Sequence, residues 1–76
     1  MKADLEAAAK KALIRANGNS ALSIALSLMN MPKIKFKFNR GTEEFDCIAL
    51  FDEARNLVEI ELINTHISGK ITFNKR

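Results

Sequence analysis

The first third of the chain places apolar residues at the three- and four-residue spacing of an α-helix. Residues 2–16 form one such stretch, which is rich in Ala, the strongest helix former. Its acids come early and its bases late, which is the order that the helix dipole prefers. Asn17-Gly18 follows as a helix stop, because Gly readily adopts a left-handed backbone. We therefore expect a helix over about 2–16 with one apolar side.

A second helix is expected over about 20–30. Asn19 or Ser20 can cap its start, and Pro32 prevents it from continuing. Its apolar residues lie around most of its circumference: Leu22, Ile24, Ala25, Leu26, Leu28, Met29 and Met31. A helix that is apolar on nearly all sides is typical of a buried position, so we expect this one to be nearly buried in the core.

After Pro32 the spacing of apolar residues falls from about 3.6 to 2, the period of β-strands. This pattern predicts four strands, over about 33–39, 44–51, 57–63 and 67–74. The short polar stretches between them suit tight turns, so consecutive strands should pair as an antiparallel meander. The predicted fold is a single α+β domain over residues 1–76, with two N-terminal helices packed on one face of a four-stranded sheet.

Three turns set which strand residues face each other, because a slip of one residue moves every side chain to the other face. The first turn is predicted at Gly41, the second as a four-residue loop closed by Asn56 in a left-handed conformation, and the third at Asn64-Thr65. The flanking pairs are Arg40 with Glu43, Asp52 with Leu57, and Ile63 with His66. The residues predicted to face the helices are Ile34, Phe36, Phe38, Phe45, Cys47, Ala49, Phe51, Val58, Ile60, Leu62, Ile67, Ile71 and Phe73.

The opposite face of the predicted sheet is the candidate binding surface. The apolar residues predicted to point outward there are Ile48, Leu50, Leu57 and Ile63. Charged residues surround them, and two pairs of opposite charge are predicted to lie directly across from each other: Lys37 with Asp46, and Glu59 with Lys70. An apolar centre with a charged rim is typical of protein interfaces, and short sheets also leave a few aliphatic side chains in solvent. Both interpretations stay open.

The composition argues against an enzyme and against a metal site. The one Cys, Cys47, falls on the predicted apolar face, and the one His, His66, falls in a predicted turn. A hydrolytic triad needs a nucleophile, a base and an orienting acid together, and a structural zinc site needs four Cys or His ligands. The three Gly match no phosphate-binding motif. We therefore expect no catalytic, cofactor-binding or metal-binding residues, and a packing role for Cys47.

The distribution of basic residues suggests an alternative function, the binding of nucleic acid. The stretch "KFKFNR" at 35–40 returns as "KITFNK" at 70–75, and twelve Lys and Arg against nine Asp and Glu give a net charge of +3. A meander makes the two stretches its outer strands, where Lys protects an exposed edge from pairing with other chains. The same charges could instead hold the phosphates of a nucleic acid. The residues predicted for that alternative are Lys33, Lys35, Arg40, Lys75 and Arg76.

No segment predicts export or membrane insertion. The opening residues carry acids and lack a continuous apolar stretch, so we expect no signal peptide. The longest apolar-rich run, "ALSIALSLMNM", has eleven residues, whereas about 20 are needed to cross a bilayer. A single Cys forms no disulfide within the chain, which suits a reducing compartment. We expect a cytoplasmic protein without a membrane span.

Together these features predict a small non-enzymatic protein-binding module, such as an accessory or inhibitor protein, that docks on another protein or on its own copy. The contact would be the outward face of the sheet or an outer strand. The residues predicted for it are Lys35, Lys37, Ile48, Leu50, Glu59 and Glu61. Nonspecific nucleic-acid binding is the alternative function.

Overall fold

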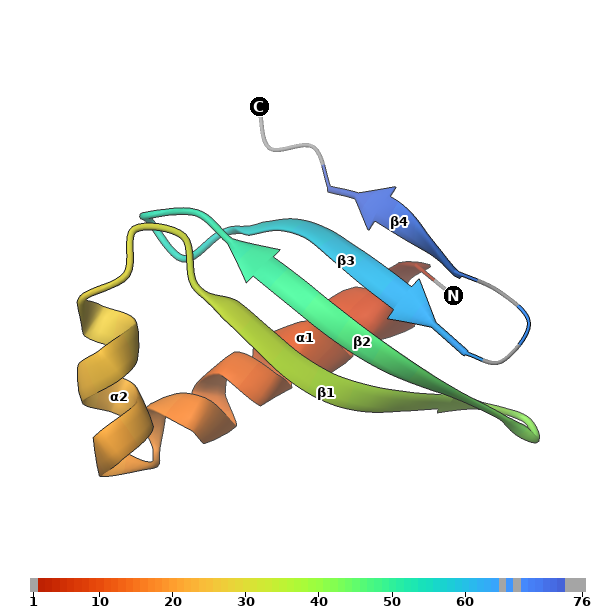
Figure 1. Cartoon of the computed structure of the whole chain (residues 1–76), viewed down its shortest axis with the longest axis horizontal. Helices are drawn as coiled ribbons and strands as arrows, with labels where there is room; N and C mark the ends of the chain where they lie inside the picture. Colours follow the sequence, from red (N-terminus) through yellow and green to blue (C-terminus); the bar gives the residue numbers. More distant parts are fainter. Residues whose placement is uncertain (1, 65, 67, 74–76) are drawn as a thin grey trace.

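The structure, a computed structural model, describes residues 2–64, 66 and 68–73. Two helices, α1 (Lys2–Asn17) and α2 (Ser20–Ser27), precede four strands: β1 (Lys33–Arg40), β2 (Glu43–Phe51), β3 (Leu57–Ile63) and β4 (Ser68–Thr72). The strands form one antiparallel sheet in the order β1-β2-β3-β4 (Figure 1). The predicted α+β fold, with both helices N-terminal to a four-stranded meander, is confirmed.

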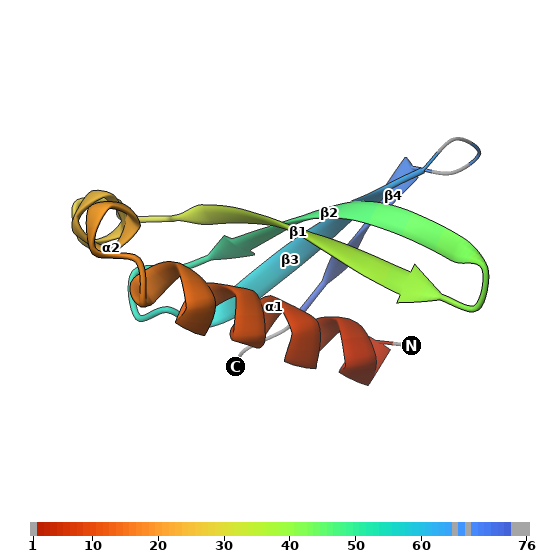
Figure 2. The same ribbon diagram turned by 90° about the horizontal axis from the view of Figure 1, so that it is seen from below.

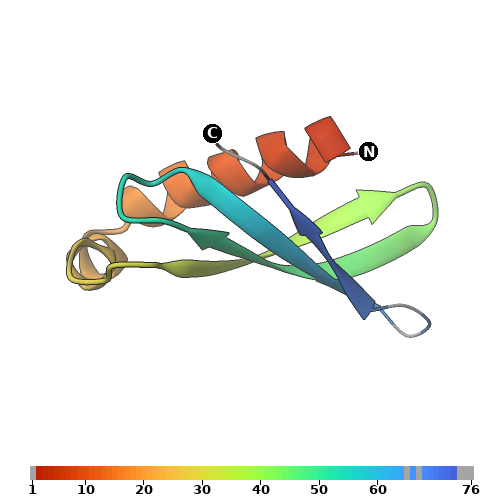
Figure 3. The same ribbon diagram turned by 90° about the horizontal axis from the view of Figure 1, so that it is seen from above.

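Helix α1 runs along one face of the sheet, and its apolar side builds the core (Figures 2 and 3). Leu5 and Ala9 are completely buried, and Ala12 is nearly so. They belong to one cluster with strand residues, of which Phe51 and Ile60 are also completely buried. The small Ala side chains let the helix lie close to the sheet, because protein cores are packed without large voids.

Helix α2 lies beside the end of the sheet, not over its face (Figures 1 and 2). Leu26 is the one buried residue among the eight of this helix, all of which are described. The prediction of a nearly buried second helix over 20–30 is therefore wrong, and the helix ends earlier, with Leu28 as its cap. The reason is geometric: α1 already occupies the face of the sheet, and the short turn after α1 starts α2 beyond the end of the strands.

The first hairpin has the predicted register. Gly41 has a φ of 63°, as the first central residue of this two-residue turn requires. Arg40 lies opposite Glu43, and Phe38 lies opposite Phe45. The Phe45 side chain is buried, so the apolar side of β2 points toward α1 as expected.

The second hairpin turns one residue earlier than predicted. Arg55, not Asn56, has the positive φ, at 70°. The Arg55 N–H donates to the Asp52 carbonyl at 2.9 Å, and the Asp52 N–H donates to the Asn56 carbonyl at 2.9 Å. The loop is therefore three residues long, and the irregular pairing that follows puts Phe51 opposite Leu57.

This irregularity changes the direction of two side chains. Leu57, which was predicted to point outward, is 1% exposed and belongs to the core. Val58, which was predicted to lie in the core, is only half-buried. An extra residue in one strand of an antiparallel pair interrupts the alternation of side chains at that point. Beyond it the predicted pairing returns, with Leu50 opposite Glu59.

The connection between β3 and β4 is longer than predicted. Ile63 lies opposite Ser68 rather than His66, so four residues separate the paired strands in place of the predicted two. The predictions for Thr65 and Ile67 fall outside the described residues.

The longer connection shifts the pairing of β4 by two residues. Lys70 lies opposite Glu61 rather than Glu59. A shift of two residues keeps every side chain on its predicted face, because side chains alternate with a period of two. Lys70 still forms an ion pair with Glu59, diagonally across the strands, with 3.7 Å between Nζ and Oε2. Phe73 remains in the core, as predicted.

Candidate functional site

One face of the sheet lies away from α1 and forms the first candidate surface (Figure 2). We call it the outer sheet face. The structure brings together on it all six residues predicted for partner binding: Lys35 and Lys37 on β1, Ile48 and Leu50 on β2, and Glu59 and Glu61 on β3. Basic, apolar and acidic rows therefore lie side by side across three strands.

The apolar centre of the outer sheet face is smaller than predicted. Ile48 and Leu50 are half-buried among their charged neighbours, and Ile63 is 37% exposed. Leu57 has turned inward and contributes nothing to this face. A hollow of about 330 Å³ is lined by residues that include Lys35, Ile48 and Ile63. It gives an apolar side chain of a partner a place to enter.

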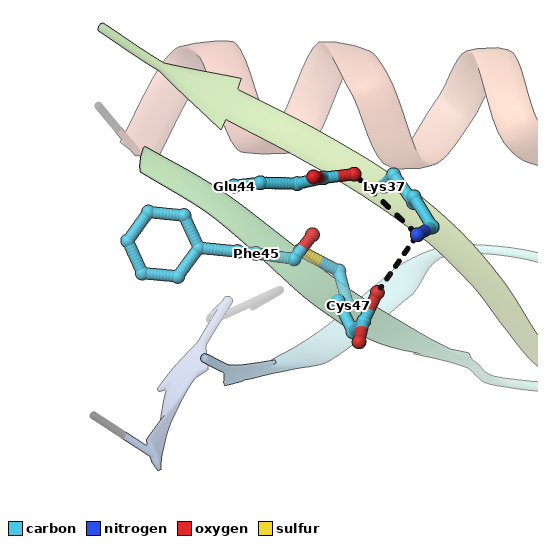
Figure 4. Close-up of polar contacts among 5 residues, drawn as sticks. Lys37, Glu44, Phe45 and Cys47 are labelled. Atoms are coloured by element: carbon cyan, nitrogen blue, oxygen red, sulfur yellow. Dashed lines mark hydrogen bonds and ion pairs between the residues drawn. The ribbon is translucent and has the colours of Figure 1, made fainter. Parts of the chain in front are cut away.

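Charges on the rim of this face are paired within the molecule. Lys37 Nζ lies 3.4 Å from Glu44 Oε2 and 3.7 Å from Asp46 Oδ1 (Figure 4). The hydrogen bond and the charge of Glu44, followed by the charge of Asp46, raise the pKa of Lys37. Water reaches all three side chains and screens these contacts, so they orient the side chains more than they stabilise the fold.

A second hollow, of about 570 Å³, lies at one end of the outer sheet face. Its lining includes Glu43, Glu44, Asp46, Lys37 and His66. Two of the acids are the partners of Lys37 described above. The hollow is thus a mixed-charge border of the outer sheet face, and it gives a partner polar groups to contact around the apolar centre.

The two residues considered for nucleophilic chemistry lie apart. Cys47 is 1% exposed on the α1 side of β2, and its Sγ donates to the Phe45 carbonyl at 4.0 Å (Figure 4). Burial, and to a smaller extent the charge of Asp46, raises the pKa of this thiol. His66 is exposed in the β3–β4 connection. In the described part of the chain, no three His, Cys, Asp or Glu side chains gather as metal ligands would.

Of the residues predicted for nucleic-acid binding, the structure describes three. Lys33 and Lys35 are exposed near the start of β1, and Arg40 lies at the opposite end of the same strand. Lys75 and Arg76 fall outside the described residues. Because β1 and β4 are the two outer strands, the repeated stretches of the sequence border opposite edges of the sheet, as expected.

Helix α2 and the segment after it form a second candidate surface, which the sequence interpretation missed. Five large apolar side chains are 46% to 82% exposed there: Leu22, Ile24, Leu28, Met29 and Met31. We call these five residues the α2 surface. No charged residue occurs from position 16 to position 32. Exposed apolar surfaces of this kind commonly mark sites of interaction.

Both ends of α2 are held by polar contacts. The Asn19 side chain accepts hydrogen bonds from the first turn of the helix, which confirms one of the two predicted caps. At the other end, the Arg55 guanidinium donates to the carbonyls of Leu26 at 2.9 Å and of Met29 at 3.2 Å. The Leu26 carbonyl also accepts from the Met29 N–H at 3.1 Å, so Arg55 adds a second hydrogen bond there and binds the Met29 carbonyl just beyond the helix. Although α2 is exposed, these hydrogen bonds from Arg55 hold its end against the β2–β3 loop.

Comparisons of this chain with protein-family models, with curated proteins and with solved structures found no match. Among the residues that the structure describes, none of the helices has the length and apolar character needed to cross a bilayer. The function is therefore argued from the two surfaces themselves.

Proposed function

We propose that this chain is a small non-enzymatic protein-binding module, an accessory or inhibitor protein of the cytoplasm, that docks a partner protein on its outer sheet face. The observation that carries the proposal is the strip formed by Ile48 and Leu50, which lies between a basic row and an acidic row on the side of the sheet away from α1. Interfaces between proteins are commonly built as an apolar centre inside a polar rim.

The charges of the outer sheet face indicate how a partner would be oriented. β1 presents Lys33 and Lys35 beside the strip, and β3 presents Glu59 and Glu61 on its other side. A partner with acids on one side and bases on the other would meet both rows, whereas the reversed orientation would bring like charges together. Such charges set orientation and association rate, and burial of the apolar strip supplies affinity.

The outer strand β1 offers a related way to dock. It is an edge strand, so one row of its backbone N–H and C=O groups is available for another strand. An extended segment of a partner could pair with this edge and lie next to the Lys row of the outer sheet face.

The cytoplasmic location is supported by the cysteine usage. Cys47 is a single, buried thiol, and the chain forms no internal disulfide. Small domains of oxidising compartments usually depend on disulfides for stability. This chain relies on its packed core instead.

The test is a pair of substitutions at the centre of the strip. Ile48→Lys with Leu50→Glu introduces charges without changing the net charge of the chain. The matched control, Ala3→Lys with Ala7→Glu, makes the same change at exposed positions of α1. Proteins retained by each tagged variant from nuclease-treated native lysate are compared after circular dichroism has shown that the fold is intact.

The wild-type chain and the control should retain the same partner, and the strip variant should lose it. If the folded strip variant retains the same partner as the control, the outer sheet face is not the docking site and the proposal fails.

Nucleic-acid binding is the second candidate, supported by the exposed Lys33 and Lys35 on β1. Glu59 and Glu61 stand on the same face and would repel phosphates. This candidate predicts an affinity that falls steeply with salt concentration, because bound phosphates release counterions. Absence of detectable binding to duplex or single strands at low salt would end it.

A further inference from the structure

The outer sheet face carries parallel rows of side chains, and the two rows beside the apolar strip have opposite charge. At one level of the sheet, Lys35 lies opposite Ile48, which in turn lies opposite Glu61. The next level along the strands repeats this order with Lys33, Leu50 and Glu59. Neighbouring strands of a sheet are evenly spaced, so the basic row on β1 and the acidic row on β3 flank the strip at equal distances.

This pattern is complementary to itself when the sheet is turned over about an axis along β2. In two sheets packed face to face, a two-fold axis that runs along β2 above the strip sets β1 of each copy over β3 of the other. Lys35 then lies over Glu61 of the second copy. At the next level, Lys33 lies over Glu59 of the second copy. The strip lies over the same strip, so the apolar contact and the ion pairs on both sides of it form together.

Other two-fold arrangements of the same faces bring like charges together. An axis across the strands sets β1 over β1 of the second copy and so places the two basic rows against each other. An axis above the gap between β2 and β3 sets β1 over β4, which places Lys35 over Lys70, the residue opposite Glu61 on β4. Like charges at close range are unfavourable. The charge pattern therefore selects the axis along β2.

The geometry of sheet packing lets these groups meet. Sheets that pack face to face lie about 10 Å apart. Aliphatic side chains fill this separation at the centre, and a Lys and a Glu side chain reach each other across it at the rim. A twisted sheet that is turned over about an axis along its strands has the same saddle shape, so the two faces follow each other across the contact.

We propose that the partner docked on the outer sheet face is a second copy of this chain, related to the first by a two-fold axis along β2. This inference rests on the function proposed above, because it uses the same face and names its occupant. The dimer buries the strip of both copies. Lys35 and Glu61 form no ion pair with another described residue of their own chain, and the dimer gives each of them a partner. An isologous contact of this kind closes after two copies.

The remaining charges of the outer sheet face are compatible with this pairing. Asp46 lies on β2 beyond the strip and would face Asp46 of the second copy at one end of the contact. Lys37, whose Nζ is 3.7 Å from Asp46 Oδ1 in the same chain, offsets this repulsion. Lys70 contacts one carboxylate oxygen of Glu59, Oε2, and the carboxylate has a second oxygen for Lys33 of the second copy.

The face as a whole has no net charge. Its bases are Lys33, Lys35, Lys37 and Lys70, and its acids are Glu44, Asp46, Glu59 and Glu61. Association of two such faces does not bring together two surfaces of the same sign. A partner strand on the edge of β1 has no such match within this chain, because a second β1 would bring the same Lys row.

The mass of the chain in solution tests the pairing. Sedimentation over a range of concentrations should show a dimer that dissociates on dilution. Lys35→Glu sets acid against acid on both sides of the strip, and Glu61→Lys sets base against base. Each variant should raise the dissociation constant by about tenfold or more. The matched control, Lys11→Glu, makes the same change of charge at an exposed position of α1 and should dimerise like the wild-type chain. Circular dichroism checks the fold of all variants.

A mixture of the two variants tests the two-fold axis. In a pair of one Lys35→Glu chain and one Glu61→Lys chain, position 35 of each chain again meets the opposite charge at position 61 of the other. The mixture should form a heterodimer whose dissociation constant is within about threefold of the wild-type value, although each variant alone pairs weakly. Both variants keep a net positive charge, so overall attraction between them does not produce this result.

Three results would overturn the inference. A wild-type chain that stays monomeric up to millimolar concentration does not pair with itself, and the outer sheet face then meets a different protein. A dimer that is unaffected by both Lys35→Glu and Glu61→Lys uses another surface. A mixture that pairs no more tightly than the two variants alone rejects the axis along β2.

Failure of this inference differs from failure of the proposed function. If the wild-type chain is monomeric, and the strip variant still loses a lysate protein that the Ala3→Lys/Ala7→Glu control retains, the docking face is correct and only its occupant is wrong. If the strip variant keeps both its mass as a dimer and its lysate partner, the outer sheet face is not the docking site and both proposals fail.

Discussion

Helices α1 and α2 follow each other in the chain, yet the core uses them very differently. α1 has charged residues toward solvent and buries Leu5, Ala9 and Ala12 against the sheet. α2 is the more apolar helix and buries Leu26 alone among its residues. Position relative to the sheet, and not apolar content, therefore decides which helix is buried. Apolar residues that the core does not use are the ones available for contacts with another molecule.

The largest effect is expected from one substitution, Leu→Ala, made in α1 and at Leu28, the cap of α2. Leu5→Ala removes a completely buried side chain and should lower the free energy of unfolding by roughly 2–5 kcal/mol, a large part of the stability of a small domain. Leu28→Ala removes a side chain that is mostly in water and should change it by less than about 0.5 kcal/mol. Chemical denaturation measures both. Similar losses of unfolding free energy in the two variants would show that α1 and α2 contribute equally to the core.

A second test removes the contact that ties α2 to the rest of the fold. Arg55→Ala takes away the guanidinium that donates to the α2 carbonyls and should cost about 1–3 kcal/mol. Arg55→Gly loses the same contact but suits the positive φ better, so it should cost about 1 kcal/mol less. Amide hydrogen exchange should accelerate in α2 and stay unchanged in α1. Equal acceleration in both helices would mean that Arg55 does not hold α2 specifically.

One titratable group on each face of the sheet, Cys47 on the side of α1 and Lys37 on the outer sheet face, should affect stability in alkali at a different pH. A thiol in the unfolded chain ionises near pH 8.5, whereas burial raises the pKa of Cys47 in the fold. The free energy of unfolding should therefore fall as the pH rises above about 8.5, by at most about 1.4 kcal/mol per pH unit. The raised pKa of Lys37 means that its contribution is complete below about pH 10.4 and is lost as the pH rises through its folded value.

Cys47→Ala separates the two contributions. Denaturation curves at increasing pH should show no early decline in this variant, while the decline above about pH 10.4 that depends on Lys37 should persist. If the wild-type chain and Cys47→Ala lose stability in parallel from pH 8.5 upward, the buried thiol is not the cause.

The smallest expected effect concerns the solvent side of α1. That side has charged residues, whereas α2 has none. Glu6 and Lys10 form an ion pair one turn apart, with 3.3 Å between Oε2 and Nζ. Glu6→Gln should lower the free energy of unfolding by about 0.2–0.5 kcal/mol, and the difference should shrink in high salt. The control Glu53→Gln changes charge at an exposed loop position. A loss for Glu6→Gln that is independent of salt would show that the effect is not electrostatic.

The strand pattern predicted much of the fold because it is a local property with a strict period. Alternation along β1 and β2 identified the faces of Phe45 and Ile48 correctly, and Gly41 identified the first turn. The β2–β3 loop was harder, because Arg55 takes a positive φ that is unusual for a residue with a side chain. Its guanidinium donates to the carbonyls of Leu26 and Met29, which are 29 and 26 residues away in the sequence. A local sequence pattern does not predict such a contact.

The six residues of the outer sheet face could be predicted because the first hairpin has the predicted register and the irregular pairing after the second loop is short. Beyond that irregularity the predicted pairing returns, so Glu59 and Glu61 keep their predicted side of the sheet. The α2 surface could not be predicted in the same way. A helix that is apolar all round has the same sequence pattern whether its own core or a second molecule covers it.

By itself, the sequence determined the order of the elements, the meander and the side of the sheet on which the strand residues lie, except for Leu57 and Val58 after the β2–β3 loop, because these features follow from short-range periodicity and turn chemistry. The tertiary structure alone decided that α1 fills the one available face of a narrow sheet. It left α2 at the end of that sheet with Ile24 and Leu28 in water, because α1 already covers the face and the short turn after it starts α2 beyond the end of the strands.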